Sequence, residues 1–146
     1  MTKIQWCPDI ANIEEATNIL TAKFQHLKYE QAYIEFDNGK IGRIQGGKDS
    51  INPTHKIRQM LQNAQMIHNH PTPNEHPRQN LIGLSGTDIG FAAALNLKSI
   101  AVLDTNTRIK ITRPKEGWKH IAAMLTFLPN SIDWTSYGKM TTWNLN

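Results

Sequence analysis

Two histidines two positions apart are the residues whose types and spacing best suit metal chemistry. Residues 66–71 read MIHNHP. We expect residues 65–67 to form a short buried strand, so that His68 and His70 leave its end on the same side. Pro71 cannot donate a backbone hydrogen bond to a sheet, so the strand should stop there and continue as a loop. The pattern therefore predicts two imidazoles side by side at the rim of a sheet.

A carboxylate at the start of a helix is the third candidate ligand. In the SGTD sequence of residues 85–88, Ser85 suits a helix N-cap or first turn, and Asp88 follows three residues later on the same face. The helix macrodipole favours a carboxylate there. Two neutral imidazoles, one carboxylate and an open fourth position form a catalytic zinc set, and a single cysteine excludes a cage of four thiolates. A His-x-His pair alone is common by chance, but together these features predict that His68, His70 and Asp88 bind Zn²⁺.

These residues resemble the motif of the JAMM (JAB/MPN) zinc metallopeptidases. That pattern is an upstream Glu, then His-x-His-Pro, then Ser-x-x-Asp, and the resemblance runs from about Tyr29 to Arg113. It points to the bacterial or phage-type JAB domain, and implies an α/β, cytidine-deaminase-like fold with a central mixed sheet flanked by helices. The chain departs from the family in residues 71–84, a loop longer than the usual connection and a candidate for substrate contacts.

The resemblance also implies a catalytic base and an oxyanion donor. The family's Glu starts the strand before a hairpin turn, and Glu30 matches that place. Glu35, five residues further on, is the competitor and should face the opposite side of the strand. We favour Glu30, because a strand end reaches the rim of a sheet. Ser85 matches the family serine that donates a hydrogen bond to the developing oxyanion, and an N-cap role is compatible with the same position.

The activity implied by the resemblance is that of an enzyme, a zinc metallopeptidase that hydrolyses a peptide or isopeptide bond in a protein or peptide, including ubiquitin-like modifiers. Zinc makes water nucleophilic, and the base passes the water's proton to the leaving amine. Two alternatives stay open: a catalytically inactive interaction module and a DNA-repair-associated JAB protein. An HNH nuclease would need a further His or Asn on the helix, which residues 85–88 do not supply.

Several other polar residues are expected to have structural or surface roles. Asn69 alternates to the side opposite the histidines and should support the strand. Glu75 and His76 lie in a Pro-broken loop and are expected to be solvated, as is His55 in the first turn of a helix. Cys7 is expected to be a small half-buried residue, because a nucleophilic cysteine needs a paired base.

Composition points to one folded domain. A chain of 146 residues with 39% hydrophobic residues suits a single domain, residues 1–146. The net charge of +4 is spread along the chain, so nucleic acid is not an expected partner. There is no long apolar run, so no membrane association is expected, and the first residues lack the core of a signal peptide, which predicts a cytoplasmic location. Oligomeric state stays open.

The elements that should position these residues alternate between helices and strands. A helix over 10–26, capped by Asp9, precedes strands 31–37 and 41–45, which are joined by a tight DNGK turn. Asn52 should cap a helix over 53–63. The remaining expected elements are the strand of the histidines, a helix over 85–96, strands over 98–103 and 108–112, a helix over 116–128 and an aromatic tail over 129–146 without a clear period.

Overall fold

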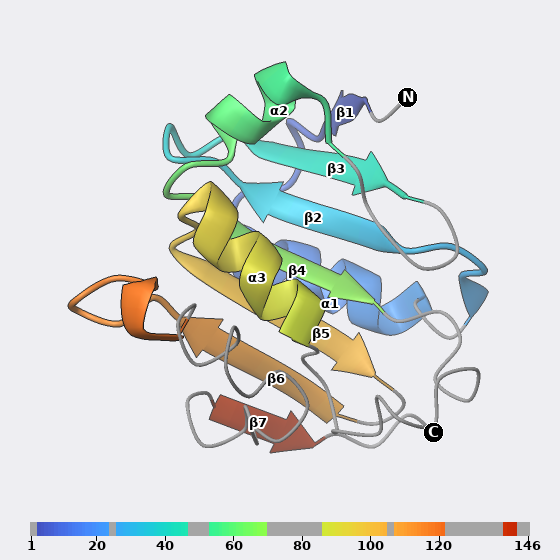
Figure 1. The fold of residues 1–146 in the computed structure, drawn as a ribbon. Coiled ribbons are helices and arrows are strands. Elements are labelled where there is room, and N and C mark those ends of the chain that lie inside the picture. Colours follow the sequence, from blue (N-terminus) through green and yellow to red (C-terminus); the bar gives the residue numbers. More distant parts are fainter. Residues whose placement is uncertain are drawn as a thin grey trace.

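One mixed sheet organises the fold. The computed structural model describes residues 3–23, 26–46, 53–69, 86–104, 107–121 and 139–142. Within these ranges, neighbouring strands are antiparallel except for one parallel pair, β4 with β5. The seven strands in the described part of the chain lie in the order β1 (Ile4–Trp6), β3 (Ile41–Gln45), β2 (Gln31–Glu35), β4 (Gln65–Asn69), β5 (Ser99–Asp104), β6 (Thr107–Thr112) and β7 (Lys139–Thr142) (Figure 1).

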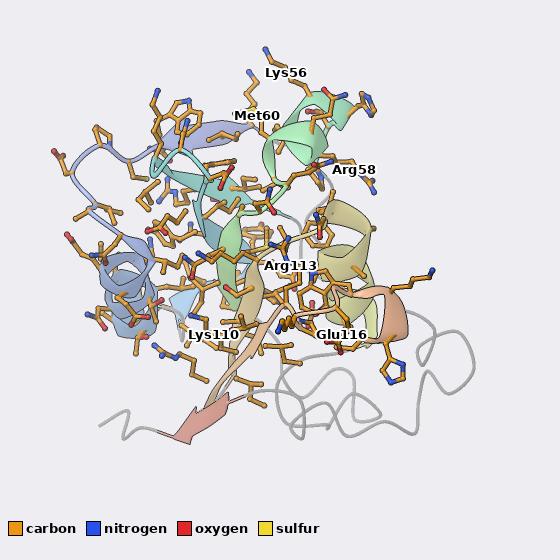
Figure 2. All side chains as sticks on the ribbon, turned by 90° about the vertical axis from the view of Figure 1, so that its left-hand side faces the viewer. Lys56, Arg58, Met60, Lys110, Arg113 and Glu116 are labelled. Carbon is orange, nitrogen blue, oxygen red and sulfur yellow. The ribbon has the colours of Figure 1, made fainter. Side chains whose placement is uncertain are left out.

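Helices cover both faces of this sheet. Figure 2 shows the sheet between α1 (Ile13–Lys23) on one side and α2 (His55–Met60) and α3 (Gly86–Leu95) on the other. The predicted α/β class, with a central mixed sheet flanked by helices, is confirmed at this level. None of the helices in the described ranges has the length and apolar composition needed to cross a bilayer.

Strand alternation divides the core into two clusters. Along β4, Met66 belongs to the cluster beneath α2 and α3, and the next residue, Ile67, belongs to the cluster beneath α1. The larger cluster includes Ile57 and Ile89 from the two helices, and the smaller one includes Leu20. Each fully buried Leu or Ile contributes about 1.5–3 kcal/mol through the hydrophobic effect. Burial on both faces therefore fixes the register of β4.

The predicted hairpin of β2 and β3 is confirmed. Its turn uses Gly39 at φ 85°, and the Phe36 amide donates to the Lys40 carbonyl at 2.9 Å. Strand β3 has the predicted bounds, and β2 ends at Glu35, two residues before the predicted end. Gly42 on β3 pairs with Trp6 of the neighbouring strand β1, and an added Cβ would stand 2.7 Å from Ile4 Cγ2. The strands therefore pack closely at a position where only glycine fits without movement.

The first two helices begin later than predicted. Asn12, not Asp9, caps α1, because Asn12 Oδ1 accepts a hydrogen bond from the Glu15 amide at 2.9 Å. Thr54 caps α2 through the Ile57 amide at 3.3 Å, and α2 ends at Met60. Each predicted helix thus started too early, because a polar residue further along the chain than the predicted cap is the actual cap.

The junction after α2 and α3 is held by an arginine. Asn63 and Asn96 have left-handed backbones, with φ of 63° and 53°, and the Asn63 amide donates to the Asn96 carbonyl at 2.9 Å. Arg113 Nη1 donates to Asn63 Oδ1 at 2.8 Å and to Asn96 Oδ1 at 3.0 Å. This contact joins the start of β4 and the start of β5, and Figure 2 shows Arg113 beside α3.

Two edge strands were not predicted. Strand β1 lies in the first residues, where no element was expected, and β7 lies within the tail that shows no clear period. The helix predicted over 116–128 begins later, because Gly117 has φ 86° and residues 119–121 are helical. Residues 122–128 of that helix lie outside the described residues. Short edge strands leave too little sequence periodicity to be recognised.

Candidate functional site

His68 lies in a central strand and not beyond its end. Strand β4 continues to Asn69, because His68 pairs with Ala32 on β2 and with Val102 on β5. The buried strand predicted over residues 65–67 thus continues for two more residues, because two flanking strands provide hydrogen-bond partners for the polar residues as well, and it ends before Pro71 as predicted. His68 is 4% exposed, so its imidazole is a buried polar group near the carboxyl end of the strand.

The parallel step brings the first turn of α3 over this strand end. A parallel connection between neighbouring strands requires a crossover, and α3 forms it between β4 and β5 (Figure 1). Asp88 lies in the first turn of α3. Asp88 Oδ1 stands 3.1 Å from His68 Nε2, with side-chain exposures of 15% and 5%. The structure thus brings together two of the three predicted metal ligands, which are twenty residues apart in the chain.

The spacing of these two donor atoms suits a shared ion. Two ligands of a tetrahedral zinc site, each about 2.0–2.1 Å from the metal, stand about 3.3 Å apart. The observed 3.1 Å is close to that value, and it also suits a direct hydrogen bond between imidazole and carboxylate. An imidazole nitrogen and a carboxylate oxygen are both normal zinc donors. The donor set and its spacing therefore fit zinc.

Glu30 is buried on the same face of the sheet. Glu30 is 7% exposed. Its backbone carbonyl accepts a hydrogen bond from the Gly46 amide at 2.8 Å, and this bond extends the β2–β3 ladder by one residue. Alternation places Glu30 on the face of Ala32, and Ala32 is directly opposite His68. Glu30, His68 and Asp88 therefore all lie on the α3 side of the sheet.

Glu35 has a different role on the other face. Its Oε1 accepts from the Ile13 amide at 3.1 Å, and its Oε2 accepts from Gln65 Nε2 at 3.0 Å. The first of these contacts satisfies a free amide at the start of α1. Glu35 therefore faces α1, opposite to the side that strand alternation gives Glu30, and it is occupied by the attachment of α1 to the sheet.

Buried polar residues concentrate at this end of the sheet. Of the six buried polar residues among the described ones, four lie at the facing ends of β2 and β4: Glu30, Gln31, His68 and Asn69. Burial of such groups is costly unless they are hydrogen-bonded, and clusters of them are typical of functional sites. The sequence did not indicate that Gln31 would be buried here, because Gln31 simply continues the alternation of its apolar neighbours in the strand.

The minor candidates are placed largely as predicted. Asn69 is fully buried, and its side chain bonds the backbone on either side of Glu30, which confirms a supporting role. His55 is exposed and contacts Gln59. Cys7 is half-buried beside the smaller core cluster.

Other candidates lie outside the described residues. These are His70, Ser85, Glu75, His76 and the remainder of the long loop. Within the described ranges, no group of three or more His, Cys, Asp or Glu side chains is arranged to hold a metal ion. The zinc set predicted from sequence is therefore represented here by His68 and Asp88.

Comparisons with known proteins add no family assignment. A scan against protein-family models, a search of curated proteins and a search of solved structures found no match to this chain. Its functional interpretation is therefore based on the motif and on the geometry of Glu30, His68 and Asp88.

Proposed function

We propose that this protein is a zinc-dependent hydrolase of the JAMM (JAB/MPN) type that cleaves a peptide or isopeptide bond. The observation that supports it most directly is the 3.1 Å approach of His68 Nε2 to Asp88 Oδ1, on the face of the sheet where Glu30 is buried. The order of Glu, His-x-His-Pro and Ser-x-x-Asp in the sequence supports it independently. A JAB/MPN-like arrangement of the whole domain is part of this proposal.

In this proposal His68, His70 and Asp88 hold the zinc ion. Zinc supplies a Lewis acid for the scissile carbonyl and makes water nucleophilic near neutral pH. Strand pairing on both sides holds the backbone of His68, the first turn of α3 holds that of Asp88, and the 3.1 Å contact between the side chains brings the two donors together before any metal binds. Preorganised donors lose little freedom on binding, which favours affinity.

Glu30 acts as the general base. Its carboxylate takes a proton from the attacking water and delivers it to the leaving amine, so that one group serves as base and then as acid. Because Glu30 is buried, bulk water competes little for its carboxylate, and electrostatic interactions in the site are stronger than in solution. Ser85, placed by the motif, donates a hydrogen bond to the oxygen that becomes negative in the transition state.

Metal analysis tests the ligands. Protein incubated with ZnCl₂ and then dialysed should retain one zinc per chain by elemental mass spectrometry. Asp88→Asn removes a zinc ligand and leaves an amide of the same shape, so we expect zinc to be lost and the fold to be kept. Asp37→Asn, at an exposed turn of the hairpin, is the matched control and should retain zinc. Wild-type protein that binds no zinc would contradict the proposal and favour an interaction module.

Turnover tests the base. A fluorescence-quenched peptide library should be cleaved by the wild-type protein and not after removal of zinc by chelation. Glu30→Gln should reduce kcat by roughly a hundredfold or more while zinc is retained, since a general base contributes about 10²–10⁴-fold. Glu35→Gln is the matched control on the opposite face and should keep its turnover. Steeply salt-dependent DNA binding by a protein without peptidase activity would instead support the DNA-repair alternative.

A further inference from the structure

The side chain of Asn69 joins the ends of β4 and β2. Asn69 is fully buried as the last residue of β4. Its Oδ1 accepts from the Gln31 amide at 2.7 Å, and its Nδ2 donates to the Tyr29 carbonyl at 3.3 Å. The two bonds differ in direction, so the primary amide uses its acceptor and its donor on the same segment of backbone.

These two backbone groups lie on either side of Glu30. The Tyr29 carbonyl belongs to the peptide before Glu30, and the Gln31 amide belongs to the peptide after it. The carbonyl of Glu30 itself accepts from the Gly46 amide at 2.8 Å on the other side. The backbone at Glu30 is therefore held from two directions, by the Asn69 side chain and by the chain after β3.

Asn69 does not share the face of the metal donors. It pairs in register with Leu103, which belongs to the cluster beneath α1, whereas His68 pairs with Val102 in the cluster beneath α3. Successive strand residues point to opposite faces, so the Asn69 side chain leaves the strand away from His68 and Asp88. The side chain of Asn69 therefore has a route to the chemistry through the backbone of Glu30, which it holds on both sides.

We propose that Asn69 is a positioning residue that sets the direction of the Glu30 carboxylate by holding the Tyr29 carbonyl and the Gln31 amide. This inference rests on the proposed function, in which Glu30 is the base. A base must lie within hydrogen-bond reach of the proton that it takes, and a misplacement of about 1 Å costs roughly a hundredfold in rate. Holding both peptides that flank Glu30 is a direct way to prevent such a shift.

The chemistry of this contact requires a primary amide. An ionised aspartate at this position has the same shape, but it offers acceptors alone, so its second oxygen would face the Tyr29 carbonyl. Serine is shorter and has a single hydroxyl, which cannot reach both groups. Asn69→Asp therefore keeps the size of the side chain and removes the bond to Tyr29, which makes it the sharpest variant.

A double-mutant cycle tests the inference. With the most rapidly cleaved peptide of the library, Asn69→Asp should lower kcat roughly tenfold or more, with KM and zinc content close to wild type. In the Glu30→Gln background, the same change should lower the residual rate by less than about twofold, since a residue that acts through Glu30 has nothing left to position.

Trp118→Phe is the matched control for a loss of stability. It also removes a buried hydrogen bond from a side chain to a backbone carbonyl, Trp118 Nε1 to Leu97 O at 2.7 Å, far from Glu30 in the sequence. This variant should melt at a lower temperature and keep its kcat. If Asn69→Asp fails to fold, the milder variant Asn69→Ser replaces it in the test. Asn69→Ser should show faster hydrogen exchange at the Gln31 amide and a similar fall in kcat.

The possible outcomes separate the two proposals. Additive effects in the cycle, an unchanged kcat in both Asn69 variants, or loss of zinc from them would overturn the positioning role while the hydrolase proposal stands. Wild-type protein that retains no zinc and cleaves no peptide would overturn both.

Discussion

Replacing Glu35 should weaken the fold without impairing chemistry, which makes it the sharpest contrast to Glu30. The Glu35 carboxylate connects three elements: it is at the end of β2, it accepts from the Ile13 amide at the start of α1 at 3.1 Å, and it accepts from Gln65 Nε2 on β4 at 3.0 Å. Glu35→Ala removes both hydrogen bonds and frees the first turn of α1 from the sheet. The variant should therefore unfold more easily.

The size of the effect follows from the two contacts. A net hydrogen bond contributes about 1 kcal/mol, and bonds to charged groups contribute somewhat more. Glu35 is half-buried, so water can replace part of what is lost, and we expect the free energy of unfolding to fall by about 2 kcal/mol for Glu35→Ala. In a domain of this size that lowers Tm by roughly 4–8 °C. Glu35→Gln should lose about half as much, since its amide oxygen can still accept from Ile13.

Thermal unfolding followed by far-UV circular dichroism measures this loss, and the peptide assay is run on the same samples. We expect Glu35→Ala to melt earlier and to keep its kcat below the melting range, whereas Glu30→Gln should melt close to wild type and lose turnover. The reasoning is refuted if Glu35→Ala melts like the wild-type protein. It is also refuted if Glu35→Gln loses turnover with an unchanged Tm, because that result would assign the base to Glu35.

Two further predictions concern packing at other points of the sheet. Gly42→Ala should lower the free energy of unfolding by about 1–3 kcal/mol, measured by urea denaturation. The reason is that the new methyl group would stand 2.7 Å from Ile4 Cγ2 and 2.9 Å from Phe36 Cε2. An unchanged denaturation midpoint would show that β1 moves away freely. Arg113→Ala should cost about 1–3 kcal/mol in the same assay, because Asn63 and Asn96 both lose a charged donor, and Arg113→Lys should recover only part of it. The prediction for Arg113 would be contradicted if the Ala and Lys variants were both as stable as the wild-type protein.

The sequence predicts the central elements of this fold well. Strand β3, the hairpin turn with Gly39 and the core of α3 follow from alternation, turn chemistry and small apolar residues. Helix starts are less predictable, because several polar residues near residue 10 can serve as a cap. The choice of Asn12 depends on Glu35, which is distant in the sequence and satisfies the Ile13 amide from across the sheet.

The site shows the same division between local and non-local information. The grouping of His68 with Asp88 and the opposition of Glu30 and Glu35 follow from spacing and strand alternation. The depth of His68 does not, because it depends on pairing with both β2 and β5. Likewise, the role of Asn69 as a strand support is visible in the sequence, but its two partners at Tyr29 and Gln31 require the register of β2 against β4.

The approach of Asp88 to His68 follows from topology more than from the length of the chain between them. Strands β4 and β5 run parallel, so α3 must return along the sheet and begin over the carboxyl end of β4. Ligands of α/β sheets commonly bind at such carboxyl ends. Each doubling in the length of a connection costs only about 0.6 kcal/mol in closure entropy, so this convergence tolerates a longer connection between the strand and the helix. A longer connection is therefore compatible with a metal site at this position.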